Sequence, residues 1–185
     1  MKNLMIAVMG IAACVASPAF AQSTGTVTID GSVAPRCLFT TPSASIELNE
    51  MALSGTGTTA GKLNTAVVNG KTRTLVGWCN GSASTMSVEA QALTLTGSAG
   101  TIPTGFDTTV NYTATAVAKG VSATHTSTDE DAGDEETVGL FTGNVVVTLS
   151  SASTPTSGLL VAGDYNGQVL VNLSAAIALP LVTSE

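Results

Sequence analysis

The chain has 185 residues, of which 44% are hydrophobic, and a formal net charge of −7 at pH 7. This length suits one domain with a substantial core, and the excess of acids argues against binding to nucleic acid through phosphate contacts. With one histidine and three cysteines, the sequence shows no His and Cys cluster of the kind that binds zinc, and we expect no cofactor.

The first 21 residues have the features of a secretory signal peptide. Lys2 supplies the positive end, residues 4–15 carry no charge, and a small-x-small cleavage motif ends at Ala21. The uncharged stretch is too short to span a bilayer, which argues against a retained anchor. A rival interpretation is a lipoprotein signal acylated at Cys14, but it would leave an apolar stretch through Phe20 on the mature protein. We therefore predict cleavage after Ala21.

Cleavage would leave residues 22–185 with a net charge of −8, because Lys2 is lost. Two cysteines, Cys37 and Cys79, would remain in an oxidising compartment, where a disulfide between them is the default expectation. Closing a loop of this size should stabilise the fold by about 4 kcal/mol on a chain-entropy estimate.

Residues 22–34 are predicted to form an N-terminal extension that contains one strand. Over 26–33, apolar or small residues alternate with polar ones, a period of two that gives a strand with one apolar face. The positions on that face are Val27, Ile29, Gly31 and Val33. Because this strand precedes the first cysteine of the expected disulfide, its own domain need not contain it. It is therefore a candidate for insertion into the domain of another chain.

Residues 35–185 are predicted to form a single all-β domain. No amphipathic helix is evident, and short alternating runs are separated by turns rich in Gly, Asn and Pro. We expect strands at 45–48, 63–68, 72–78, 86–95, 109–118, 137–149 and 165–175. Many short strands with such turns favour an antiparallel β-sandwich. Asn69 and Gly70 suit the type I′ turn of a hairpin between two of these strands.

An acidic segment, 129–136, holds six of the thirteen Asp and Glu residues. Carboxylate oxygens are the ligands that Ca²⁺ prefers, but the spacing does not match an EF-hand loop. The favoured interpretation is a solvated loop that keeps the surface charged. His125, the only histidine, lies nearby and is expected to be exposed, because a catalytic base needs partners that the sequence does not suggest.

The sequence indicates no catalytic machinery. Nucleophilic catalysis needs a base beside the nucleophile, and glycoside hydrolysis needs a framed pair of carboxylates, whereas the acids outside 129–136 are scattered singly. Trp78, next to Cys79, is expected to pack in the core on the disulfide rather than to serve as a carbohydrate platform. We expect a protein that is not an enzyme, with a hydrolase on a sandwich scaffold as the least favoured alternative.

Three features together resemble the subunits of chaperone–usher pili. They are the alternating extension that shortly precedes Cys37, a second cysteine 42 residues later at Cys79, and an alternating strand led by Gly163 near the C-terminus. The Gly-Asp-Tyr-x-Gly-x-Val pattern of that last strand is more similar to the archaic, spore-coat-U-like branch than to the type 1 branch.

The resemblance implies an immunoglobulin-like sandwich that lacks its final strand and exposes a hydrophobic groove. A periplasmic chaperone would supply a strand during assembly at an outer-membrane usher, and the extension of the next subunit would then replace it. Val27, Ile29 and Val33 would enter pockets of the groove, and Gly31 a shallow pocket with no room for a side chain. The product would be a homopolymeric pilus on the cell surface that supports adhesion or biofilm formation.

The chain departs from this resemblance at its C-terminus. Type 1-like subunits end soon after their last strand, whereas here residues 177–185 continue beyond it. This tail would allow the domain to fill its own groove, which would make the protein a self-complemented, monomeric binding protein of the secreted or surface type. The two interpretations differ in one observable: SDS-resistant, heat-sensitive ladders of polymer against a monomer.

Overall fold

The computed structural model describes residues 24–97 and 100–178. The chain divides into two compact units, Met1–Val33 and Ala34–Glu185, and each is described by itself. Residues 24–33 of the first unit contain no strand, so the strand expected at 26–33 is absent. The physical reason is that a strand needs a neighbouring strand for its backbone hydrogen bonds. The predicted signal peptide and tail residues 179–185 lie outside the described residues.

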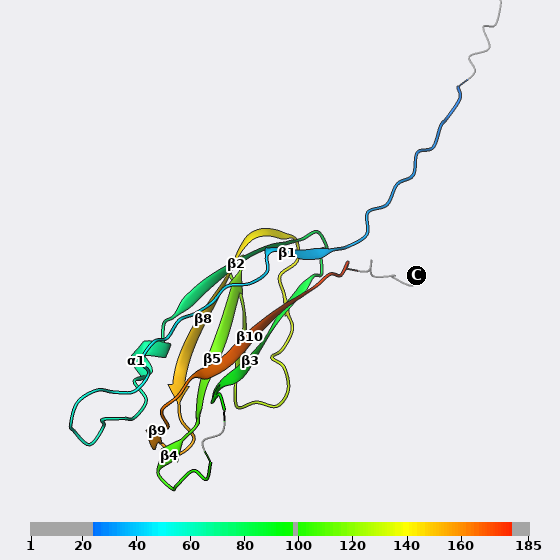
Figure 1. Ribbon diagram of the computed structural model, residues 1–185. Helices are drawn as coiled ribbons and strands as arrows, with labels where there is room; N and C mark the ends of the chain where they lie inside the picture. Colours follow the sequence, from blue (N-terminus) through cyan, green and yellow to red (C-terminus); the bar gives the residue numbers. More distant parts are fainter. Residues whose placement is uncertain (1–23, 98–99, 179–185) are drawn as a thin grey trace, which may run out of the picture. The chain divides into compact units, whose positions relative to one another are not determined.

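The second unit is an antiparallel β-sandwich, which confirms the predicted fold class (Figure 1). Its elements are β1 (Cys37–Thr41), α1 (Thr65–Val68), β2 (Thr72–Cys79), β3 (Thr85–Leu95), β4 (Phe106–Asp107), β5 (Thr109–Ala118), β6 (Val121–Thr126), β7 (Glu136–Thr137), β8 (Phe141–Ser153), β9 (Leu159–Leu160) and β10 (Tyr165–Ser174). The strands pair in the order β1-β2-β8-β5-β3-β10, with β6 beside β5 and β7 beside β3. The short β4 and β9 form a separate parallel pair.

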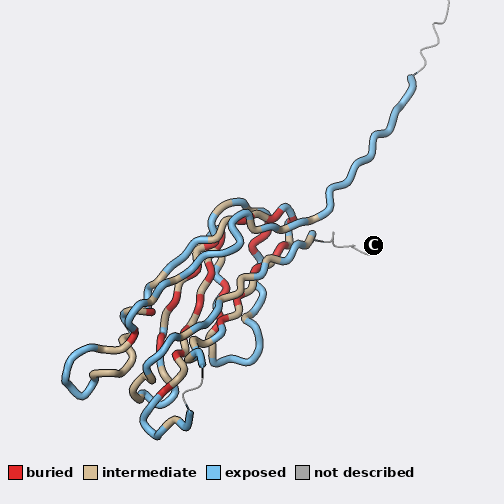
Figure 2. The backbone as a smooth tube through the Cα atoms, in the orientation of Figure 1, coloured by how far each residue is buried: buried red, intermediate tan, exposed pale blue. Residues whose placement is uncertain are grey.

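The core lies between two layers that β5 connects. Along most of its length β5 pairs with β8 and β6, and only near its start does it pair with β3, at Leu93 and Thr94. Every second residue of β5, from Val110 to Ala118, is buried, as the alternating sequence predicts. In Figure 2 the buried residues follow the strands of the sandwich, while the connections between strands are mostly exposed.

The pairing order leaves β1 and β10 at the two ends of the sheet path. The path from β1 to β10 contains five strand pairs, and each pair is antiparallel. Because five is an odd number of reversals, β1 and β10 run in opposite directions. Among the described strands, β10 pairs only with β3 and β1 only with β2. One edge of β10 therefore has no described strand beside it.

Four of the predicted strands match β2, β3, β5 and β10, but three predictions in the domain need correction. Residues 45–48 are not a strand, and 63–68 contain the short helix α1 instead. The run 137–149 is divided into β7 and β8, with Gly139 at a φ of 62° between them. The sequence also did not predict β1, β4, β6 and β9.

The hairpin predicted at Asn69 and Gly70 is wrong as well. Asn69 has a φ of −64° and a ψ of 134°, and Gly70 has a φ of 79°. This combination is typical of a type II turn, whereas a type I′ turn needs positive φ at both residues. The turn joins α1 to β2, and Val68 before it is fully buried. The asparagine side chain is used elsewhere, since its Oδ1 accepts a hydrogen bond from the Ala152 N–H at 2.9 Å.

Candidate functional site: a groove beside β10

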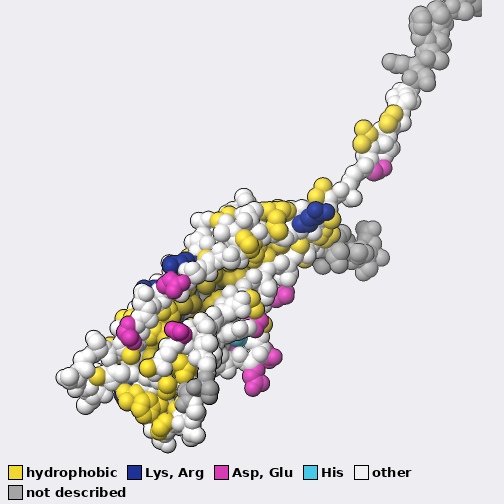
Figure 3. Space-filling model, viewed as in Figure 1, with side chains coloured by type: hydrophobic (Ala, Val, Ile, Leu, Met, Phe, Trp, Pro, Cys, Tyr) yellow, Lys and Arg dark blue, Asp and Glu magenta, His cyan; other side chains and the backbone are white. Residues whose placement is uncertain are grey.

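A groove runs along the free edge of β10. It lies between residues 42–48 on one side and residues 167–171 of β10 on the other, and its volume is about 440 Å³. Its floor is formed by Leu75 of β2, Val147 and Leu149 of β8, Tyr112 of β5 and Leu93 of β3. Figure 3 shows hydrophobic side chains gathered along this hollow. The groove is therefore a long apolar site next to unpaired strand backbone.

Residues 42–48 form the outer wall of the groove without joining the sheet. β1 ends at Thr41, after a register shift that follows Phe39, and residues 42–50 contain no strand. Ile46 and Leu48 pack against the core, and Nε of Arg73 donates a hydrogen bond to the Ser45 carbonyl. Side chains rather than a backbone ladder thus hold this wall, which leaves space between it and β10.

The disulfide lies at one end of β1 and β2. Cys37 and Cys79 are disulfide-bonded, with an S–S distance of 2.02 Å, as predicted. Further along β1, Phe39 packs over Gly77. A Cβ built on this glycine would lie 3.0 Å from Cδ1 of Phe39 and 3.4 Å from Cδ1 of Leu173 on β10. Both side chains therefore lie close to a residue that has no side chain of its own.

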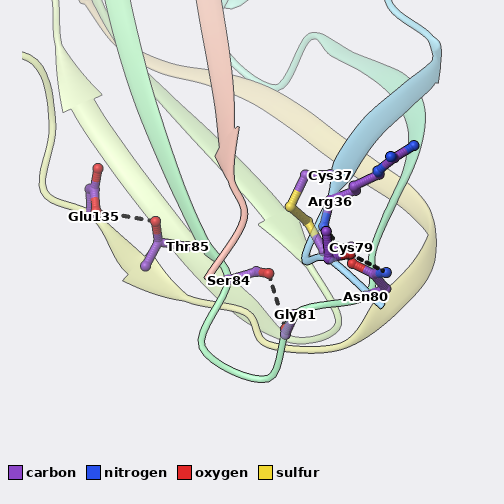
Figure 4. Close-up of a disulfide and its surroundings, with 9 residues drawn as sticks. Arg36, Cys37, Cys79, Asn80, Gly81, Ser84, Thr85 and Glu135 are labelled. Atoms are coloured by element: carbon purple, nitrogen blue, oxygen red, sulfur yellow. Dashed lines mark hydrogen bonds between the residues drawn. A yellow bond between two sulfur atoms is a disulfide. The ribbon is translucent and has the colours of Figure 1, made fainter. Parts of the chain in front are cut away.

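Figure 4 shows how the start of the domain is tied to the disulfide. Asn80 follows the second cysteine, and its Oδ1 accepts a hydrogen bond from the Arg36 N–H. Its Nδ2 donates to the Ala34 carbonyl at 3.2 Å. Trp78, in contrast, is half-buried on the side of β2 opposite the buried Gly77 and Cys79, so the predicted core position of this tryptophan is wrong. Adjacent residues of a strand face opposite sides.

Tyr112 closes the floor of the groove where β10 has a bulge. Its hydroxyl lies 2.7 Å from the Gln91 carbonyl of β3 and 3.0 Å from the Gln168 carbonyl of β10, and it donates to this pair. The register of β3 and β10 shifts between Asn166 and Gln168. Burial raises the pKa of Tyr112 to about 12, because the ionised form would lose its hydration. The tyrosine therefore stays a neutral donor at physiological pH.

The four predicted donor residues lie in the described part of the extension. Val27 is 85% exposed, Ile29 91% and Val33 85%, values unusual for large aliphatic side chains. A Cβ at Gly31 would meet nothing within 4 Å. The segment is thus an apolar surface without a hydrogen-bonded strand, and the binding of a partner by these residues stays a prediction.

The edge of β3 that faces away from β10 is closed by the chain itself. Near the start of β3, β7 pairs with it. Further along, the Gly133 N–H donates to the Val88 carbonyl at 2.9 Å, and Nδ1 of His125 accepts from the Ala90 N–H at 2.9 Å. His125 is only 5% exposed, so the expectation of an exposed histidine is wrong. The imidazole replaces a missing backbone acceptor, a role that the sequence alone does not reveal.

The acidic segment 129–136 crosses this closed edge with its carboxylates outside. All six acids are exposed, as predicted. The backbone is fixed, however, because Nε2 of His125 lies 2.6 Å from the Asp131 carbonyl and a Cβ at Gly133 would lie 2.6 Å from the Thr124 carbonyl. Within the described residues, no group of three or more His, Cys, Asp or Glu side chains could hold a metal ion.

A buried carboxylate orders the end of the domain where β4 and β9 pair. Asp107 accepts hydrogen bonds from the Thr156 N–H at 3.2 Å, the Thr156 hydroxyl at 2.9 Å and the Gly158 N–H at 2.7 Å. Burial alone would raise the pKa of Asp107, but the donors, led by Gly158, outweigh it and lower the pKa below the usual 3.8. The hydroxyl of Tyr165 donates to the Val161 carbonyl at 2.8 Å beside it. This network explains a buried acid without invoking catalysis.

Sequence reasoning missed Arg73 and the wall at 42–48. The sequence predicts a strand at 45–48, which is part of this wall and has no strand structure. Arg73 and Leu75 are two residues apart on β2. The period of two could therefore have placed Arg73 on the same face as Leu75, which lines the groove.

Comparisons of the chain with known protein families, with curated proteins and with solved structures give no match. No helix among the described residues is long and apolar enough to cross a membrane.

Proposed function

We propose that the protein is a structural subunit of an extracellular pilus of the chaperone–usher type, in which the extension of one copy fills the groove of the next. One observation carries the proposal: an apolar groove beside an unpaired strand edge occurs in a chain that also has an exposed, apolar-faced segment before its domain. Exposed strand edges promote association with other chains. Strand addition to such an edge is an established mode of recognition.

The inserted segment would complete the sheet between β10 and the wall. Because β1 and β10 run in opposite directions, a strand antiparallel to β10 would run in the direction of β1. Val27, Ile29 and Val33 would then face the apolar floor, and Gly31 a shallow part of it, while the intervening polar residues would face solvent. Main-chain hydrogen bonds to β10 would supply affinity and the side-chain contacts specificity.

The donor and acceptor surfaces are different parts of the same chain, so the contact is heterologous and repeats without closing. Such contacts generate fibres. The proposal includes export through the periplasm to the cell surface, a chaperone that covers the groove before assembly, an outer-membrane usher, and a role in adhesion or biofilm formation. The role is structural, and we propose no catalytic activity.

The alternative is a monomer whose own tail fills the groove. After β10 the chain is bonded to residues that precede β3, because the Ala83 N–H donates to the Ala176 carbonyl at 3.1 Å and the Ala178 N–H to the Ser82 hydroxyl at 3.1 Å. These bonds hold residues 176–178 beside the turn between β2 and β3. They favour occupation of the groove by another segment, and residues 179–185 lie outside the description.

The test replaces one inward residue of the extension and, as a matched control, its outward neighbour. Ile29→Asp would place a charge in an apolar pocket, which costs at least several kcal/mol per joint, and surface fibres should be lost. Thr28→Asp introduces the same group on the solvent face and should leave fibres intact. Each variant is expressed with its secretion machinery, and SDS-resistant, heat-sensitive ladders are scored against the amount of periplasmic subunit.

Normal ladders from Ile29→Asp would falsify assembly through the extension. Loss of folded subunit with Ile29→Asp, but not with Thr28→Asp, would mean that the extension completes its own domain. A monomer in every variant, including the wild type, would support the self-complemented binding protein.

A further inference from the structure

The groove and the extension each contain one charge, and the two charges are opposite. Among the described residues that line the groove, Arg73 is the only charged one. Asp30 is the only charged residue in 24–33. The chain has only six Lys and Arg against thirteen Asp and Glu, so the presence of Arg73 in an otherwise uncharged groove calls for an explanation. Charge complementarity between these two surfaces provides one.

Arg73 has hydrogen-bonding capacity left for a partner. Its Nε donates to the Ser45 carbonyl of the wall, and one terminal nitrogen donates to the Thr72 carbonyl at 2.8 Å. Among the described residues, no carboxylate pairs with it and no group accepts a hydrogen bond from its other terminal nitrogen. The side chain is exposed, lines the groove and contacts the wall at Ser45. An arginine in this position can bind a carboxylate with paired hydrogen bonds.

The apolar face of the extension does not by itself choose a register. A slip of one residue would turn the apolar face outward, but a slip of two keeps it inward. Some further feature must distinguish between registers that differ by two. A charge pair at one position would do so, because each slip would separate the charges by about 6.6–6.8 Å along the strands.

We propose that Arg73 recognises Asp30 of a second copy's extension and thereby fixes the register of the inserted strand. This inference rests on the proposed function. An extension antiparallel to β10 is also antiparallel to β2, on which Arg73, Leu75 and Gly77 follow one another toward the disulfide end. With Gly31 level with Arg73, Ile29 lies over Leu75, and Asp30 is one residue, or about 3.4 Å along the strand, from Arg73.

The same register accounts for the glycine in the extension. Gly31 comes to lie over the aliphatic stem of Arg73, where the floor is raised by a long side chain. Val33 then reaches the end of the groove formed by Leu149 and Tyr112. A slip of two residues would instead place Ile29 or Val33 over Arg73 and overfill that position. Arg73 therefore acts twice, by attracting Asp30 and by leaving room only for Gly31.

The test is a charge swap in the full-length chain, expressed with its secretion machinery. Asp30→Arg and Arg73→Asp should each lower the yield of SDS-resistant polymer about three- to tenfold, and the double variant should restore most of it. Ser32→Arg, also on the outward face, is the matched control and should assemble normally. Protease resistance of the periplasmic subunit reports whether Arg73→Asp, which also releases Ser45, still folds.

Two results would overturn the inference. One is normal assembly of Asp30→Arg, a change outside the unit Ala34–Glu185 that remains decisive if Arg73→Asp fails to fold. The other is a double variant that assembles no better than either folded single variant. If the charge variants assemble normally while Ile29→Asp does not, the pair is wrong and the proposed function stands. If Ile29→Asp also assembles, the proposed function itself is wrong.

Discussion

The two outer edges of the layer formed by β3 and β10 are treated in opposite ways. The edge of β3 is covered along its length by β7, by the N–H of Gly133 and by the imidazole of His125. The edge of β10 borders an apolar groove, and its wall is held only by side chains. Loops of the chain thus close one edge, whereas no described strand pairs with the other. This contrast supports the view that the open edge serves a partner, since exposed edges are otherwise a hazard.

The closed edge also shows how little backbone is needed to complete a sheet. Ala90 lies in β3, yet its N–H is satisfied by a histidine 35 residues away rather than by a strand. Since that N–H donates, Nδ1 of the imidazole accepts, and Nε2 carries the hydrogen that is donated to the Asp131 carbonyl. One side chain therefore links β3, β6 and the acidic loop.

The largest change would come from breaking the disulfide at the end of the open edge. Replacing Cys37 and Cys79 by Ala should lower the free energy of unfolding by about 4 kcal/mol. It should also loosen β1 and the wall that continues from it. Urea unfolding followed by the fluorescence of Trp78, the only tryptophan, measures the loss. Reduction of the wild type should reproduce it, and an unchanged midpoint in both cases would show that the disulfide does not support the wall.

A smaller loss should follow from opening the closed edge. His125→Leu fills the space with an apolar side chain but leaves the Ala90 N–H without an acceptor, which should cost about 1–3 kcal/mol. Hydrogen exchange of the Ala90 amide should speed up at the same time. Asp131→Asn is the matched control, because it removes a charge but keeps the carbonyl that His125 contacts, and its effect should stay within about 0.5 kcal/mol. Equal losses in the two variants would mean that the charge of the acidic segment, and not the hydrogen bond to the Ala90 N–H, accounts for the lost stability.

The smallest change concerns Tyr112 on the floor of the open edge. Tyr112→Phe removes one hydroxyl and should cost about 1 kcal/mol at neutral pH. Because folding raises the pKa of this tyrosine from 10.0 to about 12, its contribution is fully present below pH 10 and is lost as pH rises toward 12. The difference between wild type and variant should therefore shrink over that interval. Val169→Ala, which has no titrating group, should show a constant difference.

The sequence by itself determined the all-β class, the disulfide and the strands whose periodicity is uninterrupted. β5 is the clearest case, because every second residue from Val110 to Ala118 is buried. Such alternation is a local property, since successive side chains of any strand face opposite sides. The apolar face of the extension was visible for the same reason.

Only the tertiary structure decided which alternating segments find strand partners. Residues 45–48 alternate like a strand but become the wall of a groove, and His125 sits among polar neighbours yet is buried as an acceptor for Ala90. Arg73 lines the groove only because β2 lies beside the wall. Hydrogen-bond partners, and the edges that lack them, depend on residues far apart in the chain, and local periodicity carries no information about such contacts.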